Sequence, residues 1–340
     1  TRRAFLASSA FVATAVPPLA RGADRKPLDV VIRGGTIVDG TGHAARQADI
    51  GIRGDRIVAL GDLSASRAGR TLDARGRIVC PGFIDMHTHS DRTLLADGHA
   101  QSAVRQGATT HVVGNCGSSP APSVTPAEIR GHRLSTYGDF LKALGSEGTS
   151  INVCGLVGHN AIRRAVIGDQ ARRPTSGELR QMQDHVDEAM RAGAVGMSTG
   201  LVSPPGTYCE TNEIVALARI VARHQGLYAS HIRGEASTVI EAVQEAITVG
   251  RQAGLPVEIS HHKAAGRENW GKTAKTLPLV EQANQAGHRV RVDVYPYHAG
   301  SAGLAQLVPP WAHAGGRGAM LARLKDPAQR RQIPHDMTPG

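Results

Sequence analysis

The sequence predicts an α/β fold: a TIM-like (β/α)8 barrel that lacks its last strand, preceded by a small N-terminal β-sandwich half. From residue 82 onward, apolar β-rich runs alternate with helical segments, which is the pattern of a parallel sheet with crossover helices. Gly107, Gly193, Gly226, Gly254 and Gly287 each follow a helical segment, and the last four are 33, 28 and 33 residues apart. This spacing is the length of one βα unit, and a glycine just past a helix end supplies a left-handed conformation.

Seven strands are expected in the barrel, one short of the eight of a closed TIM barrel. They are residues 83–87, 111–114, 151–157, 195–198, 227–230, 257–260 and 290–295. Between strands three and four, Thr175 and Glu178 form a capping-box pattern, and apolar residues from Leu179 to Met190 then recur on one helical face. After a further helical stretch near 319–332 an eighth strand would be due. We therefore expect the barrel, residues 81–340, to be incomplete at its C-terminal end.

Residues 24–80 read as a small all-β module. Strands at 30–32 and 36–38 are expected to flank Gly34-Gly35. Strands at 50–52 and 56–58 flank Gly54-Asp55, a two-residue hairpin signal with glycine first.

The first 23 residues have the features of an export signal. Arg2-Arg3 begins a twin-arginine pattern, the mildly apolar stretch 7–20 follows, and small residues at 20–23 provide a cleavage site. The stretch is too short to span a bilayer. We expect a periplasmic or secreted protein, exported by the twin-arginine route, with no membrane association afterwards.

Composition describes an ordinary globular protein, with 41% hydrophobic and 20% charged residues and a formal charge of +10. A basic balance can indicate nucleic-acid binding, but the arginines are scattered and no basic run is interleaved with aromatics. We therefore expect no nucleic-acid partner. The four cysteines show no C-x-x-C spacing, and free or buried thiols are expected for Cys80, Cys154 and Cys209.

Ligand-capable residues follow four of the expected strands. His87 and His89 end the first strand, and because they are two residues apart both imidazoles face the same side. Cys116, His231 and His261 follow strands two, five and six. Any one of the 16 histidines would more often be a core or surface residue, but active sites of such barrels gather at the C-terminal ends of the strands. A thiolate with two imidazoles is a three-ligand zinc set that leaves one position open for water.

These motifs together resemble a known family. Residues 80–91, Cys-Pro-Gly-Phe-Ile-Asp-Met-His-Thr-His-Ser-Asp, are similar to the first-strand signature of the metal-dependent amidohydrolase superfamily, and the β module is similar to its half-sandwich. Within it, five further segments resemble the N-acyl-D-amino-acid deacylase (D-aminoacylase) family: 114–117, 198–201, 230–233, 259–263 and 293–297. Many relatives bridge two metals with a Lys or Glu from strand four, whereas residues 196–200 contain neither.

The resemblance implies a role for each matching residue. The implied ligands are Cys116, His231 and His261 for one tight zinc site, with His87 and His89 at a weaker second site. The implied substrate-binding residues are Lys263, Tyr295 and Ser301, with Arg233 as their companion. Tyr208 either lines the pocket or packs, and His262 points to the opposite side of its strand from His261.

The implied reaction is zinc-dependent hydrolysis of N-acyl-D-amino acids, small-molecule substrates, to a carboxylate and a free D-amino acid. The family uses an Asp at the end of strand eight as general base. Asp326 and Asp336 follow no apolar strand, so we identify no catalytic base within the chain and expect that Asp beyond Gly340. Because proton transfer contributes about 10²–10⁴-fold, we expect the 340 residues alone to turn over poorly.

Two alternatives stay open at this point. One is a cyclic amidase or an isoaspartyl-dipeptidase-like amidohydrolase, which would be expected to carry the strand-four Lys or Glu. The other is an inactive, truncated metal-binding fragment. The residues leave open the acyl group, the side chain accepted, D against L selectivity and the oligomeric state.

Overall fold

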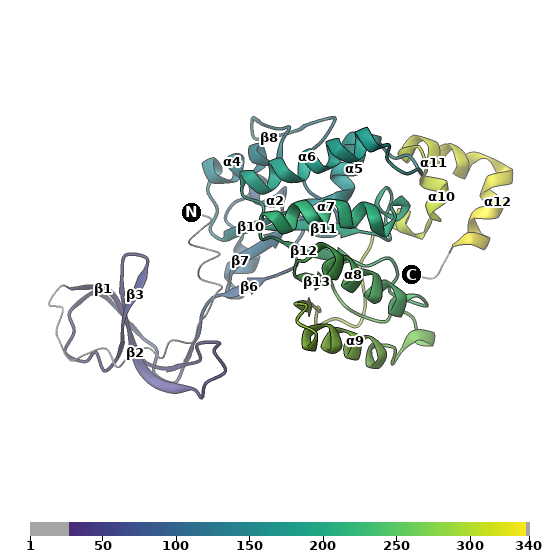
Figure 1. Cartoon of the computed structure of the whole chain (residues 1–340). Helices are drawn as coiled ribbons and strands as arrows, with labels where there is room; N and C mark the ends of the chain where they lie inside the picture. Colours follow the sequence, from purple (N-terminus) through teal and green to yellow (C-terminus); the bar gives the residue numbers. More distant parts are fainter. Residues whose placement is uncertain (1–26, 338–340) are drawn as a thin grey trace. The chain divides into compact units, whose positions relative to one another are not determined.

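The structure is a computed structural model that describes residues 27–337, so the export signal predicted at 1–23 lies outside the described residues. The chain divides into two compact units (Figure 1), the first ending at Phe83 and the second beginning at Ile84.

The first unit contains a five-stranded sheet. Its strands are β1 (Leu28–Ile37), β2 (Arg46–Arg53), β3 (Arg56–Gly61), β4 (Ala68–Asp73) and β5 (Ile78–Val79). They follow the order β3-β2-β1-β4, and β5 also pairs with β1. The hairpin predicted at Gly54-Asp55 is confirmed, because Arg53 pairs with Arg56 and Gly54 has a φ of 57°.

The prediction of two separate strands around Gly34-Gly35 is wrong. Both belong to β1, whose pairing with β2 shifts register between Ile32 and Gly35. Gly34 has a φ of 68°, so the chain passes through a bulge here and continues along the same strand.

The second sheet has seven strands and is curled. Its strands are β6 (Phe83–Asp85), β7 (Ala108–Val113), β10 (Asn152–Gly158), β11 (Gly196–Gly200), β12 (Leu227–His231), β13 (Val257–Ile259) and β14 (Val290–Val292). Their order is β14-β13-β12-β11-β10-β7-β6, and each neighbouring pair from β7 to β14 is parallel. The seven strands expected from the sequence are thus confirmed. The two outer strands end two and three residues earlier than expected, at Asp85 and Val292, and β7 and β13 each end one residue earlier.

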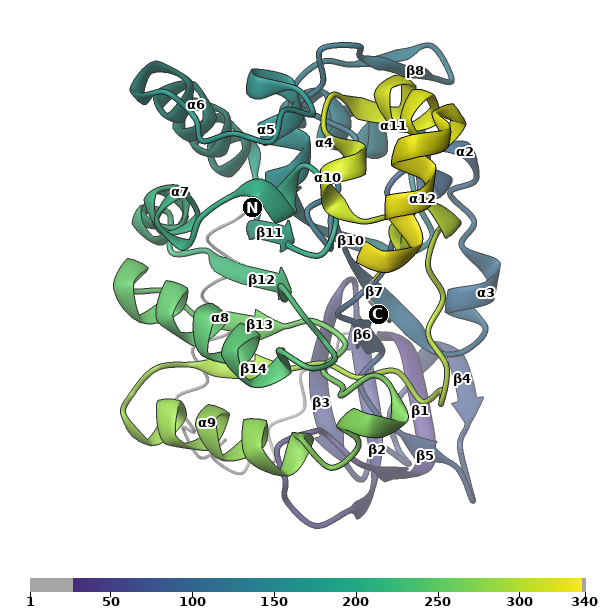
Figure 2. The ribbon, with the colours of Figure 1, turned by 90° about the vertical axis from the view of Figure 1, so that its right-hand side faces the viewer.

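Helices connect these strands. They are α2 (Thr93–Ala96), α3 (Gln101–Val104), α4 (Tyr137–Glu147), α5 (His159–Ile167), α6 (Ser176–Ala192), α7 (Thr211–Arg223), α8 (Val239–Ala253), α9 (Thr273–Gln285), α10 (Pro310–His313), α11 (Gly316–Lys325) and α12 (Pro327–Asp336), with 3-10 turns η1 (Gly206–Tyr208), η2 (Arg267–Asn269) and η3 (Leu304–Leu307). A hairpin of β8 (Ala127–Ile129) and β9 (His132–Leu134) precedes α4. Figure 2 shows α6, α7, α8 and α9 following one another along one face of the sheet. Among residues 27–337, none of the helices is both long and apolar enough to cross a bilayer.

Helix α6 forms as the sequence predicted. Thr175 and Glu178 make both hydrogen bonds of the capping box. Met182, Val186 and Met190 are fully buried in the main core, and Leu179 packs against it.

Glycine ends the helices at four of the five predicted positions, with positive φ at Gly107, Gly193, Gly254 and Gly287. The prediction fails at Gly226, because α7 ends early and Gln225 takes the left-handed conformation, with a φ of 57°. Space still favours glycine at 226, since a Cβ there would lie 2.7 Å from Val221 Cγ1 and 3.0 Å from the Val195 carbonyl oxygen.

The helical stretch predicted near 319–332 is two helices. Asp326 separates α11 from α12 and caps the second, its Oδ1 accepting hydrogen bonds from the backbone N–H groups of Ala328 and Gln329 at 2.8 and 2.9 Å. Pro327 occupies the first turn of α12, where its missing N–H costs no hydrogen bond.

A close backbone contact positions the loop that follows β7. Gly114 has a φ of 80°, and a Cβ there would lie 1.9 Å from the carbonyl oxygen of Leu156 in β10. No side chain fits between these backbones, so glycine lets residues 114–117 lie directly on the neighbouring strand.

We expect Gly114→Ala to lower the free energy of unfolding by at least about 2 kcal/mol, because alanine meets both a left-handed backbone and a carbonyl oxygen. Gly145→Ala is the matched control: Gly145 lies in α4 with nothing within 4 Å of its Cβ position. Alanine there should leave stability unchanged or raise it by about 0.5–1 kcal/mol. Urea unfolding of both variants measures the difference, and equal midpoints would contradict the proposed contact.

Candidate metal centre

The Cys116 loop is fixed by buried hydrogen bonds. The Ser198 hydroxyl, fully buried on β11, accepts a hydrogen bond from the Gly117 N–H at 2.9 Å and donates one to the Gly114 carbonyl. The Asn115 amide donates to the Val112 carbonyl at 2.9 Å. Cys116 itself has a φ of 53°. The thiol is thus presented from a tight turn that is held by hydrogen bonds on both sides of it.

Two imidazoles face this thiol. Cys116 Sγ lies 3.3 Å from His87 Nε2 and 3.5 Å from His261 Nε2. The three donor atoms all lie within 4.8 Å of one another, and the three residues are half-buried. Nitrogen and sulfur donors are the set that zinc prefers, and three of them leave a coordination position open. The residues therefore fit a zinc ion.

A carboxylate contacts the outer nitrogen of each of these imidazoles. Asp293 Oδ2 lies 3.0 Å from His87 Nδ1, and Asp293 Oδ1 accepts the backbone N–H of His261 at 2.5 Å. Glu235 Oε1 lies 2.7 Å from His261 Nδ1. Such outer contacts fix the tautomer and orientation of ligating histidines.

His231 lies on the other side of His261. The two ring centroids are 4.3 Å apart, and His231 Nε2 lies 3.8 Å from Glu235 Oε1. His231, Glu235 and His261 therefore form a second group of donors, and His261 belongs to both groups. His89 is farther out, with its ring centroid 5.4 Å from that of His87.

Burial keeps His231 neutral. It lowers the pKa of His231 to about 3 and also lowers the pKa of His89. A neutral imidazole has a free lone pair, which a metal ligand needs.

The surrounding acids give the site a negative charge. Burial, together with the carboxylates of Glu235, Asp293 and Glu258, raises the pKa of the Cys116 thiol to about 12. Burial opposes ionisation of Glu235, but the hydrogen bond from His261 and the nearby cations hold its pKa at about 2. Burial and the adjacent Asp293 raise the pKa of Glu258, so this pair of carboxyls shares one proton. A cation would relieve the repulsion among these groups.

Residues 70–330 match the profile of the amidohydrolase family. The chain belongs to that family. It is 42% identical over 292 residues to a D-aminoacylase of Alcaligenes xylosoxydans xylosoxydans, an alignment that covers 83% of this chain and 60% of that protein. The chain spans between 57% and 60% of the length of the three most similar curated relatives reported, a D-aminoacylase and two N-acyl-D-amino-acid deacylases.

Solved structures of amidohydrolases show the same similarity to D-aminoacylases and related deacylases. A D-aminoacylase studied for its binuclear metal center is 39% identical, with a TM-score of 0.78, and the match covers 91% of this chain and 70% of that one. An N-acyl-D-glutamate deacylase from Bordetella bronchiseptica, in complex with zinc and a phosphonate that mimics the tetrahedral intermediate, is 40% identical, with a TM-score of 0.76; the match covers 80% of this chain and 59% of that one. Within the amidohydrolase family the chain therefore resembles the D-aminoacylases, as its motifs predicted.

Lys263 and Tyr295 adjoin the metal-binding groups of this amidohydrolase. Lys263 Nζ lies 2.7 Å from Glu235 Oε1 and 5.4 Å from the centroid of the Tyr295 ring. The Tyr295 ring centroid is 6.4 Å from that of His261. Ser301 is exposed.

Arg233 has a different environment from Lys263. Its guanidinium donates to both carboxylate oxygens of Glu245 at 2.9 Å and to the Thr207 carbonyl at 3.2 Å. Most of its donors are thus engaged within the protein. Tyr208 donates its hydroxyl hydrogen to the Pro310 carbonyl at 2.6 Å, which agrees with the packing alternative.

Sequence reasoning missed four residues of the site: Ser198, Glu235, Glu258 and Asp293. Asp293 had a detectable signal, because it follows strand seven at the edge where the other donors gather. Glu235 had a weaker one, four residues after His231 in a loop. Ser198 and Glu258 have no sequence signal that separates them from ordinary strand residues.

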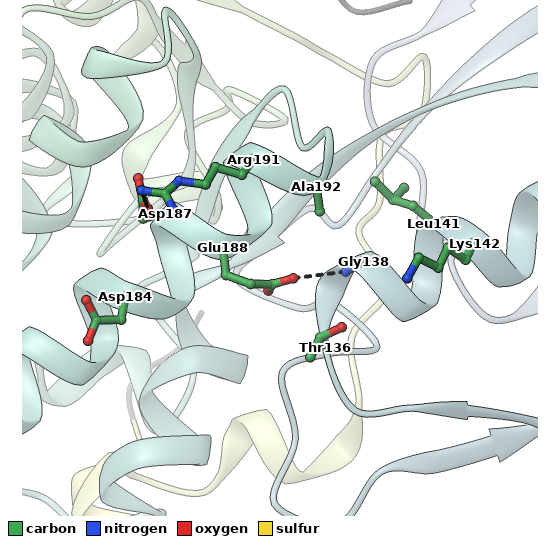
Figure 3. A pocket seen from close by; sticks show the side chains of 9 residues that line it. All are labelled: Thr136, Gly138, Leu141, Lys142, Asp184, Asp187, Glu188, Arg191 and Ala192. Carbon is green, nitrogen blue, oxygen red and sulfur yellow. Dashed lines mark hydrogen bonds and ion pairs between the residues drawn. The ribbon is translucent and has the colours of Figure 1, made fainter.

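An outer groove of about 860 Å³ lies between α4 and α6 (Figure 3), lined by Thr136, Gly138, Leu141, Lys142, Asp184, Asp187, Glu188, Arg191 and Ala192. Three of its charged side chains have partners within the protein. Arg191 pairs with Asp187 at 2.7 Å, and Glu188 accepts the Gly138 N–H at 3.3 Å. The groove has no histidine or cysteine in its lining, so we assign it no chemistry.

A buried ion pair joins α5 to α7. Glu213 accepts hydrogen bonds from Arg163 Nη1 at 2.5 Å and His159 Nε2 at 2.8 Å, and all three residues are buried. Cys209 is close enough to complete a set of three metal donors with His159 and Glu213. Because the guanidinium already neutralises Glu213, we interpret the cluster as structural.

We expect Arg163→Met to lower the free energy of unfolding by about 3–5 kcal/mol, because it leaves a buried carboxylate without its cation. Arg173→Met is the control: Arg173 pairs with Glu210, and both side chains are largely exposed, so the loss should stay below about 1 kcal/mol. Urea unfolding compares them. A loss below 1 kcal/mol in Arg163→Met would show that the pair contributes little.

Proposed function

We propose that this amidohydrolase catalyses zinc-dependent hydrolysis of the amide bond of N-acyl-D-amino acids, giving a carboxylate and a free D-amino acid. One observation carries the proposal: a half-buried thiol faces two carboxylate-bound imidazoles at the C-terminal edge of the parallel sheet. The likeness to D-aminoacylases supplies the substrate class.

In the proposed tight zinc site His231 joins Cys116 and His261, and His87 and His89 belong to a weaker second site. His261 belongs to both donor groups that the structure brings together. His87 is also close enough to Cys116 to serve the tight site. Zinc at such a site polarises an amide carbonyl and lowers the pKa of water bound to it toward neutrality.

The substrate is held by the chain's own polar groups. The Lys263 ammonium binds the substrate carboxylate by charge, and Ser301 adds a hydrogen bond. Arg233 has a lesser role, through the guanidinium hydrogen that Glu245, Thr207 and Cys209 leave free. The Tyr295 hydroxyl donates to the oxygen on which negative charge develops. A well-placed donor of this kind lowers the activation free energy by about 3 kcal/mol.

The general base lies outside the 340 residues in this proposal. Asp293 has both oxygens engaged, by His87 and by the His261 N–H. Asp326 caps α12, and Asp336 accepts the Trp311 indole N–H at 2.9 Å. We infer that an Asp following an eighth strand supplies the base, and that this strand completes a TIM-like barrel beside a β-sandwich half.

Hydrolysis of cyclic amides is the less favoured reaction. Strand β11, residues Gly196–Gly200, contains neither the Lys nor the Glu that bridges two metals in many relatives. An L-hydantoinase of 20% identity matches with a TM-score of 0.56, which shows a common fold alone.

We also propose that the protein is exported by the twin-arginine route to the periplasm or beyond, on the strength of Arg2-Arg3 and the apolar stretch after them. Fractionation of cells that express the natural N-terminus tests this, and full retention in the cytoplasm would contradict it.

We expect the chain to bind zinc, and Cys116→Ser to weaken zinc binding at least about 10-fold, because a hydroxyl is a poorer zinc ligand than a thiolate. Cys154→Ser is the matched control, since Cys154 lies on β10 outside the donor groups. Competition with a chromophoric chelator measures both affinities.

Release of free amine from N-acetyl-D-amino acids, their L enantiomers and isoaspartyl dipeptides, together with ring opening of hydantoins to N-carbamoyl amino acids, then tests the substrate class. It is measured with the 340 residues and with any natural sequence that follows Gly340. We expect hydrolysis of the D substrates above all others. Equal or faster hydrolysis of hydantoins would contradict the proposal.

A further inference from the structure

Glu235 contacts three of the groups assigned to metal and substrate. Its Oε1 lies 2.7 Å from His261 Nδ1, 2.7 Å from Lys263 Nζ and 3.8 Å from His231 Nε2. It stands in the loop after β12, and its side chain is 16% exposed. One carboxylate oxygen therefore links the imidazoles to the ammonium.

The neighbours of Nδ1 determine which ring nitrogen of His261 carries the hydrogen. A neutral imidazole carries one N–H, and the nitrogen that binds a metal must be the other one. His261 Nε2 is the nitrogen that faces Cys116, at 3.5 Å. Metal binding through Nε2 therefore requires the hydrogen on Nδ1.

Two neighbours act on Nδ1 in opposite directions. A carboxylate can only accept a hydrogen bond, so Glu235 favours the hydrogen on Nδ1. An ammonium can only donate, and Lys263 Nζ lies 3.0 Å from the same nitrogen. If Lys263 donated to Nδ1, the imidazole hydrogen would move to Nε2 and block the metal-binding lone pair.

We propose that Glu235 is a positioning residue that fixes the Nδ1–H tautomer of His261 and keeps the Lys263 ammonium from donating to that nitrogen. By pairing with Lys263, the carboxylate takes the hydrogen bond that the ammonium would otherwise give to the imidazole. Glu235 thereby allows a cationic substrate anchor to stand beside a metal ligand. The inference rests on the proposed zinc site.

The first test is zinc affinity, measured by chelator competition and independent of turnover. We expect Glu235→Leu to weaken zinc binding about 10- to 100-fold, the usual effect of removing a partner of a ligating histidine. Glu235→Gln retains an acceptor oxygen and should lose less than Glu235→Leu. Glu188→Leu removes a half-buried carboxylate from the outer groove (Figure 3) and should leave zinc affinity unchanged.

The second test separates the tautomer from general damage. In the double variant Glu235→Leu with Lys263→Met, Nδ1 has lost the donor as well as the acceptor, so zinc affinity should recover at least threefold over Glu235→Leu alone. A role in folding alone would give no such recovery.

The third measurement is the tautomer itself. In the zinc-free protein, the nitrogen chemical shifts of His261 should show Nδ1–H in the unaltered chain and Nε2–H in Glu235→Leu.

Each outcome has a distinct meaning. Zinc binding by Glu235→Leu within twofold of the unaltered chain, or an unchanged His261 tautomer, would overturn the role of Glu235 and leave the zinc site standing. No recovery in the double variant would overturn the part assigned to Lys263. If the unaltered chain bound no zinc, the proposed site and this inference would both fall.

Discussion

Three glycines let the backbone of residues 114–117 lie in direct contact with neighbouring strands, and the site depends on this. A Cβ at Gly114 would lie 1.9 Å from the Leu156 carbonyl oxygen, and one at Gly200 would lie 2.2 Å from the Cys116 carbonyl oxygen. One at Gly158 would lie 2.3 Å from the Gly117 carbonyl oxygen. Any side chain at these positions would push the loop outward. Since ligand geometry tolerates displacements of only a few tenths of an ångström, the thiol can meet the imidazoles because the sheet is bare at these points.

A layer of acids then organises the donors that the sheet brings together. Asp293 contacts His87 with one oxygen and the His261 backbone with the other, so one carboxylate links the residues that follow β6 and β13. Glu235 couples His261 to Lys263. Both ligand and substrate groups therefore depend on carboxylates that touch neither substrate nor metal in the proposed mechanism. Changes at these acids would alter the site without removing any of the proposed zinc ligands.

The strands of the parallel sheet could be predicted from the sequence, because each buried strand is a short apolar run bounded by glycine and polar residues. The candidate metal donors could be predicted for the same reason, since they stand at the ends of such runs: His87, Cys116, His231 and His261. Contacts between residues that are far apart in the sequence could not be predicted. His87 and Asp293 are 206 residues apart, and nothing local to either position predicts their hydrogen bond.

Local conformation produced smaller errors of the same kind. The bulge in β1 depends on pairing with β2, and the left-handed residue after α7 falls on Gln225 because the helix ends early. His262, which the strand alternation placed on the far side from His261, bonds Thr276 of α9 at 2.8 Å.

Cys116 and His261 share a backbone conformation that ordinary residues seldom adopt, with φ values of 53° and 38°. Left-handed residues turn their side chains away from the alternating directions of a strand, so these two donors are aimed by turns that follow β7 and β13. Asparagine, aspartate and histidine accept this conformation more readily than alanine or the β-branched residues do. The peptide backbone therefore constrains substitution at 261 as well as the chemistry does: asparagine would replace the imidazole at little conformational cost. Such a variant would keep the shape of the turn without the imidazole as a metal ligand.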